Sequence, residues 1–304
     1  MRILRNNFNL KYTKKSILVI GNFDGLHKGH VSILKEAKNL AKKNKLKFGL
    51  LTFDPNPKEF FLKNKDLKII GNFEKEKILS NMKLDFLISL KFNNNLRNLS
   101  AENFIHKILN NSISPSKIIV GKEFKFGKNR MGSTKLLRKY FSVKVAKQKK
   151  ILGKKISSSQ IRKFIQAGKI NNANILLGRR WTVIGEVISG NKIGRKLGFR
   201  TANLLIKNCI KPLRGVYVTR LHVDKKPYDG ISNFGIAPTI NVKESEVLET
   251  HLFKTVKNLY KKKVKIEFFK YLRKEKKFKT KKNLTDQIKK DITIAKKILK
   301  NVRK

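Results

Sequence analysis

Near residue 177 the pattern of apolar residues changes, and this change limits the folds open to the chain. Before it, short apolar runs alternate with segments whose apolar residues recur at helical spacing. Strand, helix and strand in succession are typical of a parallel sheet whose faces are covered by helices. The sequence predicts strands at residues 16–20, 48–53, 86–90 and 118–120, and helices at residues 31–43, 75–81 and 101–110.

After residue 177 the chain is rich in β-forming residues and ends in one helical pattern. Gly, Pro and Asn turns separate the apolar runs, which predicts a compact antiparallel barrel with strands at residues 181–188, 216–223 and 264–271. From Asn283 an apolar stripe predicts a terminal helix across the barrel, through Ile288, Ile292, Ala295 and Leu299. We therefore expect an α/β plus β chain with domains at residues 1–178 and 179–304.

The net charge is extreme. Lys+Arg 73 against Asp+Glu 20 gives a formal charge of +53, which suits polyanionic partners such as nucleic acid, acidic membranes or small anions. Lysine far outnumbers arginine and is spread along the chain, as expected from an AT-rich genome. We interpret most of the excess as a solvated lysine-rich surface, with no specific nucleic-acid partner.

A single cysteine, Cys209, excludes an internal disulfide and indicates a reducing compartment. The longest early apolar run, residues 17–20, is far too short for a membrane span, and no signal-peptide pattern follows it. We expect a soluble cytoplasmic protein without a membrane partner, and the sequence does not indicate its oligomeric state.

Two of the five histidines, His27 and His30, lie in the densest chemical motif, G-N-F-D-G-L-H-K-G-H at residues 21–30. The motif falls between a predicted strand and a predicted helix, where free backbone N–H groups bind phosphates. Gly25 and Gly29 allow close approach of a ligand, and the imidazoles can donate hydrogen bonds to a phosphoryl transition state. Capping or surface histidines around a tight turn remain an alternative, and a zinc site is disfavoured because no third ligand is near.

A second motif, I-S-S-S-Q-I-R at residues 156–162, sets hydroxyls at a predicted helix start with an arginine one turn later. This arrangement can clamp phosphate, although Ser-rich helix caps are common. Together the two motifs resemble the H-x-G-H and I-S-S-T-x-x-R signatures of nucleotidyltransferases. With L-T-F-D-P-N-P-K-E-F-F at residues 51–61 and V-G-K-E-F-K-F-G at residues 120–127, the chain is similar to the bacterial bifunctional riboflavin kinase/FMN adenylyltransferases, the prokaryotic FAD synthetases.

The resemblance implies a Rossmann-like nucleotidyltransferase fold in which the FMN phosphate attacks the α-phosphorus of ATP directly and releases pyrophosphate. It implies that His27 and His30 contact the ATP phosphates, while Ser158, Ser159 and Arg162 hold the β and γ phosphates. It also implies an ATP pocket at Gly21, Asn22, Phe23, Asp24 and Gly29, and flavin contacts at Pro57, Phe61, Glu123 and Phe124. Departures are Asn56 for the usual histidine, Glu123 for Asp or Asn, and Ser159 for threonine.

A Gly-rich basic segment, G-N-K-I-G-R-K-L-G-F-R-T-A-N at residues 190–203, has the glycines and oxygen ligands of a phosphate loop, but a segment of this composition is more often just a turn. It resembles the riboflavin kinase signature, and four further motifs follow in order at residues 214–218, 230–239, 248–252 and 271–278. By that resemblance Glu249 is the base for the ribityl hydroxyl and Thr201 and Asn203 serve Mg²⁺ and phosphate. The same resemblance implies an ATP loop through Gly190, Gly194 and Gly198, in a riboflavin-kinase β-barrel.

Three further residues in this half are notable. Arg200 replaces a proline beside the predicted metal ligand, so we expect a lower kinase rate. Lys261 replaces a usual glycine, and we interpret His251 as structural. The leading hypothesis is a bifunctional enzyme that uses ATP, Mg²⁺ and riboflavin to make FMN and then FAD. Alternatives are the same fold with one activity lost, a basic nucleic-acid-binding protein, or a cytidylyl- or pantetheine-phosphate adenylyltransferase, which leaves residues 179–304 unexplained.

Overall fold

The computed structural model describes residues 1–5, 10–151, 153–189, 199, 201–237, 245–254, 256 and 258–302. The chain forms two compact units. The first contains residues 1–65 and 72–157, and the second contains residues 66–71 and 158–304. Residues 66–71 thus belong with the C-terminal half although they lie early in the sequence.

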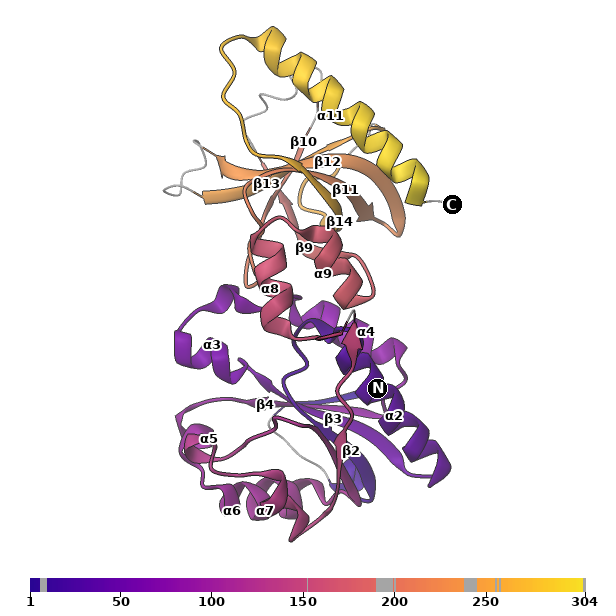
Figure 1. The fold of residues 1–304 in the computed structure, drawn as a ribbon, viewed down its shortest axis with the longest axis vertical. Coiled ribbons are helices and arrows are strands. Elements are labelled where there is room, and N and C mark those ends of the chain that lie inside the picture. The colour runs from indigo at the N-terminus through magenta and orange to yellow at the C-terminus, as the bar shows by residue number, and fades with distance from the viewer. Residues whose placement is uncertain are drawn as a thin grey trace. The chain divides into compact units, whose positions relative to one another are not determined.

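The first unit is built on a six-stranded parallel sheet (Figure 1). The strand order is β1-β4-β3-β2-β5-β6. Every residue of β2 is buried, because helices cover both faces of the sheet at its centre. The strands are β1 (Arg2–Arg5), β2 (Ser16–Ile20), β3 (Lys47–Asp54), β4 (Phe86–Lys91), β5 (Lys117–Gly121) and β6 (Ser142–Ala146).

Helix α2 (Lys28–Lys43) buries Leu34, Ala37 and Ala41, the stripe that its sequence predicts. The π-helical segment η3 (Phe104–Ile113) buries Phe104, Ile105 and Leu109 in the core that includes Leu18 and Ile20 of β2. The predicted helix at residues 101–110 is therefore a short α-helix, α6 (Ala101–Asn103), continued as a π-helix. The remaining helices are α1 (Leu10–Thr13), α3 (Pro57–Leu62), α4 (Asn72–Asn81), α5 (Asn94–Asn98) and α7 (Thr134–Arg138), and β7 (Lys150–Ile151) pairs with β8 (Lys154–Lys155).

The second unit is a closed antiparallel barrel of order β10-β13-β12-β11-β14-β9, preceded by helices α8 (Ser158–Gln166) and α9 (Ile170–Leu177). Its interior is filled by large side chains, among them Trp181, Tyr217, Phe234 and Phe268. The strands are β9 (Trp181–Ile188), β10 (Thr201–Leu205), β11 (Gly215–Val223), β12 (Lys226–Ala237), β13 (Ser245–Leu252) and β14 (Lys263–Arg273).

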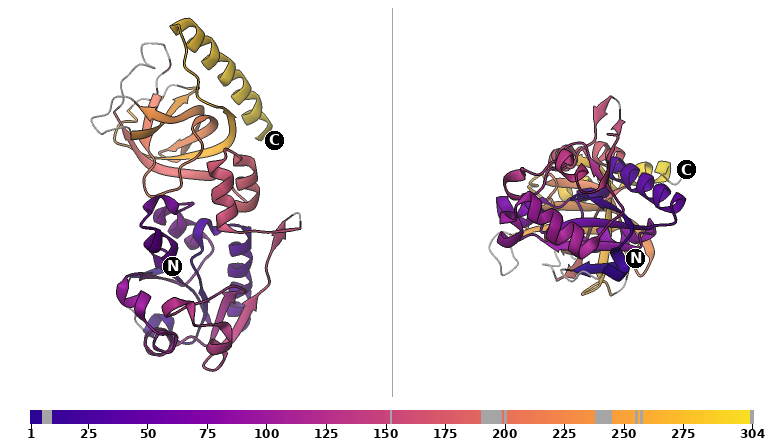
Figure 2. Two further views of the ribbon diagram at one scale, coloured as in Figure 1. Left: turned by 60° about the vertical axis from the view of Figure 1, so that its left-hand side comes forward. Right: turned by 90° about the horizontal axis from the view of Figure 1, so that it is seen from below.

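Helix α11 (Lys281–Val302) lies along the outside of the barrel in both figures (Figure 1, Figure 2). The predicted stripe makes this contact: Ile288, Ile292, Ala295 and Leu299 pack with Val216, Val218, Ile231 and Phe269 of the barrel. The predicted fold class, a parallel sheet with helices followed by an antiparallel barrel with a terminal helix, is confirmed.

Candidate active sites

A tight turn follows β2 at the carboxyl edge of the parallel sheet. Phe23 and Leu26 take left-handed backbone angles, with φ of 48° and 41°, although neither is glycine. Both side chains are buried, so packing holds the turn in a conformation that such residues rarely adopt. Gly25, with φ of 77°, takes the same region without strain. The turn therefore has a fixed shape, as expected of a ligand-binding segment.

His27 and His30 meet at the start of α2. His27 is the N-cap residue, and its Nδ1 accepts a hydrogen bond from the backbone N–H of His30 at 3.2 Å. Because Nδ1 accepts, the proton of the neutral ring resides on Nε2. The two rings stack with centroids 3.6 Å apart. A Cβ at Gly29 would lie 3.2 Å from the His27 ring, so this glycine leaves room for it.

Lys75 of α4 anchors the same turn and was not predicted from the sequence. Its Nζ donates to the backbone oxygen of Asn22 and to Thr52 Oγ1, both at 2.7 Å. Thr52 Oγ1 in turn donates to the oxygen of Asn22 at 3.0 Å. A single lysine among so many carries no sequence signal. The contact places a cation at the residues that follow the carboxyl end of β2.

The chain order around β2 marks the usual ligand position of such a sheet. Strand β2 pairs with β3 on one side and with β5 on the other. The chain builds the sheet from β2 through β3 to β4 in one direction and then continues with β5 on the opposite side of β2, so the strand order reverses at β2. Glu123 and Phe124 follow β5 at this edge. Glu123 forms an ion pair with Lys155, whose hydrogen bond and charge lower the pKa of the Glu123 carboxyl. Phe124 stacks on Phe126 with centroids 5.6 Å apart.

Asn56 has a clear local role. Its side chain accepts hydrogen bonds from the backbone N–H groups of Lys58 and Glu59, while Glu59 accepts from its backbone and side-chain nitrogens. This reciprocal capping box begins α3, with Pro57 in the first turn. The departure from histidine therefore supplies a good helix cap.

Phe61, at the end of α3, presents an aromatic surface. It is 57% exposed, and its ring meets those of Phe60 and Phe92 edge-on at 5.7 and 5.9 Å. The Arg97 guanidinium lies 5.4 Å from its centroid. An exposed phenylalanine held by neighbours in this way suits stacking on a flat ligand.

The segment at residues 156–162 joins the two units. Within the first unit, Ile156 lies beside the turn, since a Cβ at Gly29 would be 3.9 Å from the Ile156 Cβ. Ser158 and Ser159 begin α8 in the second unit, where the buried Arg162 donates from Nε to the backbone oxygen of Leu67 at 2.7 Å. A shared phosphate site between these residues and the histidines stays a prediction.

In the barrel, the strand register sets three polar residues in one row. Glu249 of β13 lies directly opposite Asn203 of β10 and opposite Asn233 of β12. Residues opposite each other in antiparallel strands share a face of the sheet. Thr250, the next residue of β13, points inward, and its hydroxyl forms a hydrogen bond with that of the fully buried Ser232. The row Asn203–Glu249–Asn233 therefore lies on the outer face of the barrel.

The amide oxygens of this row need partners. The Oδ1 atoms of Asn203 and Asn233 are both buried and accept no hydrogen bond within the described residues. Asn203 itself is 7% exposed, and Thr201, two residues earlier on β10, shares its face. An unpartnered buried amide oxygen beside a hydroxyl and a carboxylate suits a hard cation such as Mg²⁺. Partial burial, and then the nearby carboxylate of Glu275, raise the pKa of the Glu249 carboxyl.

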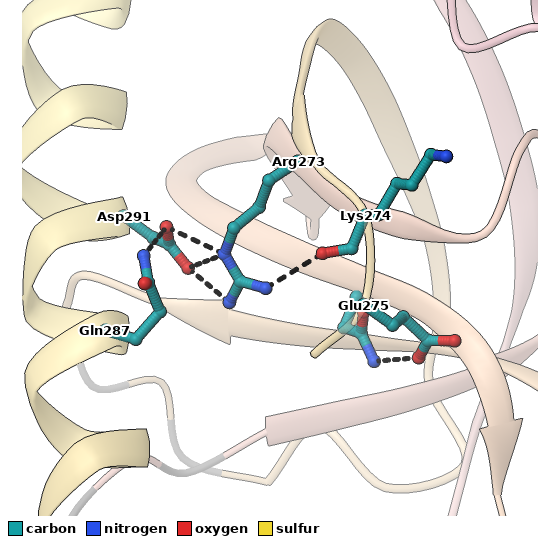
Figure 3. Close-up of polar contacts among 6 residues, drawn as sticks. Arg273, Lys274, Glu275, Gln287 and Asp291 are labelled. Carbon is teal, nitrogen blue, oxygen red and sulfur yellow. Dashed lines mark hydrogen bonds and ion pairs between the residues drawn. The ribbon is translucent and has the colours of Figure 1, made fainter. Parts of the chain in front are cut away.

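Glu275 was not predicted as a site residue, although it lies in the last of the motifs. Its Oε1 accepts a hydrogen bond from Asn233 Nδ2 at 2.9 Å (Figure 3). Only the structure reveals this contact, because no regularity of spacing links Glu275 of the segment after β14 to Asn233 of β12.

Of the remaining predicted residues of the kinase motifs, the structure describes two, His251 and Lys261, and leaves four undescribed. The ring of His251, opposite Thr201, lies edge-on to Phe199 at 5.2 Å. Lys261 has a φ of 60°, which explains why glycine suits this position. Four predicted residues lie outside the described part of the chain: Gly190, Gly194, Gly198 and Arg200.

Nowhere among the described residues do three or more His, Cys, Asp or Glu side chains gather as metal ligands. None of the helices that the structure describes has the length and apolar character to cross a membrane.

Comparisons with known proteins agree with the two-unit architecture. The FAD synthetase family matches residues 9–160, and the riboflavin kinase family matches residues 177–299. The chain is 39% identical to a bifunctional riboflavin kinase/FMN adenylyltransferase from Buchnera aphidicola subsp. Schizaphis graminum, over 98% of each chain. Its identity to the enzyme of that name from Bacillus subtilis is 34%, over 95% of this chain and 94% of the relative.

A solved structure of the same fold carries a different description. It is a crystal structure of a macrolide-efflux protein from Streptococcus pneumoniae, and it matches with a TM-score of 0.86 at 27% identity. The match covers 97% of this chain and 99% of that one. With both family matches in order and relatives similar over nearly their whole length, this chain belongs to the family of bifunctional riboflavin kinase/FMN adenylyltransferases.

Proposed function

We propose that this chain makes FAD from riboflavin in two ATP-dependent steps, with the kinase in residues 179–304 and the FMN adenylyltransferase in residues 1–178. Family membership over nearly the whole chain supports both activities. The observation that carries the proposal is the register that sets Asn203 opposite Glu249 on the barrel. It joins the two most informative residues of separate kinase motifs in one row.

In the kinase, Glu249 accepts the proton of the terminal ribityl hydroxyl as that oxygen attacks the γ-phosphorus of ATP. A raised pKa suits this role, because a base works best when its pKa approaches the working pH. Thr201 and Asn203 would hold Mg²⁺, and the buried, unpartnered Oδ1 of Asn203 fits that assignment. When bound, the ion neutralises phosphate charge. Gly190, Gly194 and Gly198, the predicted ATP-binding glycines of the kinase, lie outside the described residues.

In the adenylyltransferase, the FMN phosphate attacks the α-phosphorus in line and pyrophosphate leaves. His27, with its proton on Nε2, and His30 donate hydrogen bonds to the phosphates at the start of α2, where the helix dipole also favours negative charge. Gly21, Asn22, Phe23, Asp24 and Gly29 shape the pocket. Ser158, Ser159 and Arg162, from the second motif of this half, hold the β and γ phosphates.

The flavin of FMN binds at Pro57, Phe61, Glu123 and Phe124. The exposed ring of Phe61 supports this assignment, because an isoalloxazine is flat and aromatic. Glu123, held by its ion pair with Lys155, gives the proposed flavin site a carboxylate.

The test separates the two activities. Purified protein is incubated with riboflavin, ATP and Mg²⁺, and the flavins are separated by chromatography. His27→Ala should abolish FAD while sparing FMN, and Glu249→Ala should abolish FMN from riboflavin while sparing FAD from supplied FMN. If both variants keep both activities, the site assignments are wrong, and if the wild type turns over neither flavin, the proposed function is wrong.

The partners are small molecules, since riboflavin, FMN and ATP are the substrates of this family. We place the protein in the cytoplasm, because its single cysteine suits a reducing compartment. Specific nucleic-acid binding is not part of the proposal, since lysine is dispersed and arginine is sparse.

A further inference from the structure

The polar row on the barrel continues beyond the proposed base to Asn233. This residue lies directly opposite Glu249 on one side and opposite Val216 on the other. Its Nδ2 donates to Glu275 Oε1 at 2.9 Å (Figure 3). An ionised carboxylate only accepts hydrogen bonds, so it selects the NH₂ end of the amide. The orientation of Asn233 is thereby fixed, with Oδ1 at the other end.

Glu275 is itself held in place by its surroundings. A side chain at Gly235 of β12 would collide with the Glu275 carboxylate, so glycine makes room for it. Two residues earlier, Arg273 binds Asp291 of α11 through Nε and Nη2, at 3.0 and 2.7 Å (Figure 3). Arg273 also donates to the backbone oxygen of Lys274 at 3.0 Å. Glu275 therefore contacts β12 directly, and the segment that precedes it is bound to α11 through Arg273.

Asn233 Oδ1 is buried and, within the described residues, accepts no hydrogen bond. Leaving such an oxygen without a donor is costly. Directly opposite residues of antiparallel strands have Cβ atoms roughly 4.5–5.5 Å apart, so Asn233 and Glu249 present two acceptors side by side. A ligand that supplies two neighbouring donors would satisfy both.

The positions of the three residues in the row indicate which of the two substrates lies next to Asn233. The proposed metal ligands Thr201 and Asn203 lie on β10, on one side of Glu249, and Asn233 lies on β12, on the other. In phosphoryl transfer the attacking and leaving oxygens are roughly in line through phosphorus. With ATP on the β10 side, the acceptor molecule extends from Glu249 towards β12.

Resting on the proposed kinase function, we propose that Asn233 is a specificity-determining residue for the acceptor: its Oδ1 accepts a hydrogen bond from the hydroxyl next to the one that is phosphorylated. The ligand chemistry is a vicinal diol at the end of a polyol chain, which the ribityl group of riboflavin carries. Glu275 is the positioning residue that keeps Oδ1 turned to the acceptor.

The experiment compares two acceptors, riboflavin and an analogue that lacks only the penultimate ribityl hydroxyl. The wild type should phosphorylate the analogue with a kcat/KM at least roughly ten-fold lower than that for riboflavin, because the analogue leaves a buried acceptor atom unpaired. Asn233→Ala should lower kcat/KM for riboflavin by a similar factor and treat the two acceptors alike. In Glu275→Gln the new amide can donate as well as accept, so it no longer fixes the orientation of the Asn233 amide. This variant should therefore lose part of the preference for riboflavin over the analogue.

The matched control is Asp224→Asn. Asp224 is an exposed carboxylate of the same barrel that pairs with Lys262 at 2.6 Å, far along β11 from the row, and its loss should leave the discrimination intact. Folding of each variant is checked by the emission of the single tryptophan, Trp181, which is buried in the barrel.

Three outcomes overturn the inference: equal use of both acceptors by the wild type, full discrimination by Asn233→Ala, or a higher Mg²⁺ requirement of that variant with discrimination unchanged. If Asn233→Ala does not fold, the wild-type preference and Glu275→Gln decide. A wild type that phosphorylates neither acceptor instead contradicts the proposed function.

Discussion

Asn56 stands where the family usually has histidine, and its side chain caps α3. Asn56→Ala removes the acceptor for two backbone N–H groups and one donor to the buried Glu59. We expect a loss of about 1–3 kcal/mol in the free energy of unfolding, measured in urea by circular dichroism. Asn94→Ala, at an exposed position of α5, is the control and should change little. Equal stability of the two variants would mean that the cap is dispensable.

Glu267 of β14 gives the barrel a defined response to acid. Burial opposes its ionisation, but hydrogen bonds and charge from His222 and Lys265 outweigh burial and lower its pKa from 4.5 to about 2. A carboxyl with a depressed pKa stabilises the fold above its unfolded pKa, and this is lost as the pH falls from about 4.5 through 2. The contribution is up to about 3 kcal/mol.

The measurement is urea unfolding followed by Trp181 emission at pH values from neutral to strongly acidic. The wild type should lose stability between pH 4.5 and 2 more steeply than Glu267→Gln, which has no carboxyl to protonate. Identical slopes for the two proteins would show that other carboxyl groups account for the acid response. Asp224→Asn should keep the wild-type slope.

At the level of elements, α11 is joined to the barrel by an apolar stripe and by one buried ion pair. Asp291, with 3% of its side chain exposed, accepts three hydrogen bonds from Arg273 and one from Gln287 (Figure 3). Removing one member of such a pair leaves a buried charge uncompensated. Asp291→Ala should therefore destabilise the barrel by about 3–5 kcal/mol.

This loss is measured by urea unfolding with Trp181 emission, and Asp286→Ala, an exposed acid of the same helix, is the control. Because Arg273 lies two residues before Glu275 and donates to the backbone oxygen of Lys274, loss of its partner should lower kcat/KM of the kinase, while FAD formation from supplied FMN should not change. A variant with full stability would mean that the apolar stripe alone holds α11.

Some elements followed from the sequence and others did not, for physical reasons. Strands β2 and β9 and the stripe of α11 match the prediction, because buried runs and helical spacing are local signals. Strands β1 and β6, at the sheet edges, were missed, since β1 is short and β6 is half exposed. The π-helical course of η3 depends on packing that its composition does not reveal.

The same distinction holds for the sites. Motifs identified Asn203 and Glu249, but Asn233, Glu275 and Lys75 gain their roles from contacts between residues distant in sequence. The compact second unit begins at Ser158, where the composition does not yet change. Helices α8 and α9 are ordinary amphipathic segments; only contacts such as that of Asn174 Nδ2 with the backbone oxygen of Phe268, at 3.0 Å, assign them to the barrel.

For the whole molecule, the charge of +53 makes the folded state repel itself. Salt screens this repulsion over a Debye length of about 10 Å at 0.1 M, so the melting temperature should rise by several degrees between low salt and 0.5 M NaCl. Lysine is dispersed, so Trp181 emission, which reports the barrel, and circular dichroism, which reports both units, should shift together. Millimolar pyrophosphate that raises the melting temperature far more than its ionic strength explains would instead reveal specific anion binding. We expect such binding only at the two ATP sites. Glu249→Ala and His27→Ala should therefore each keep the response to NaCl.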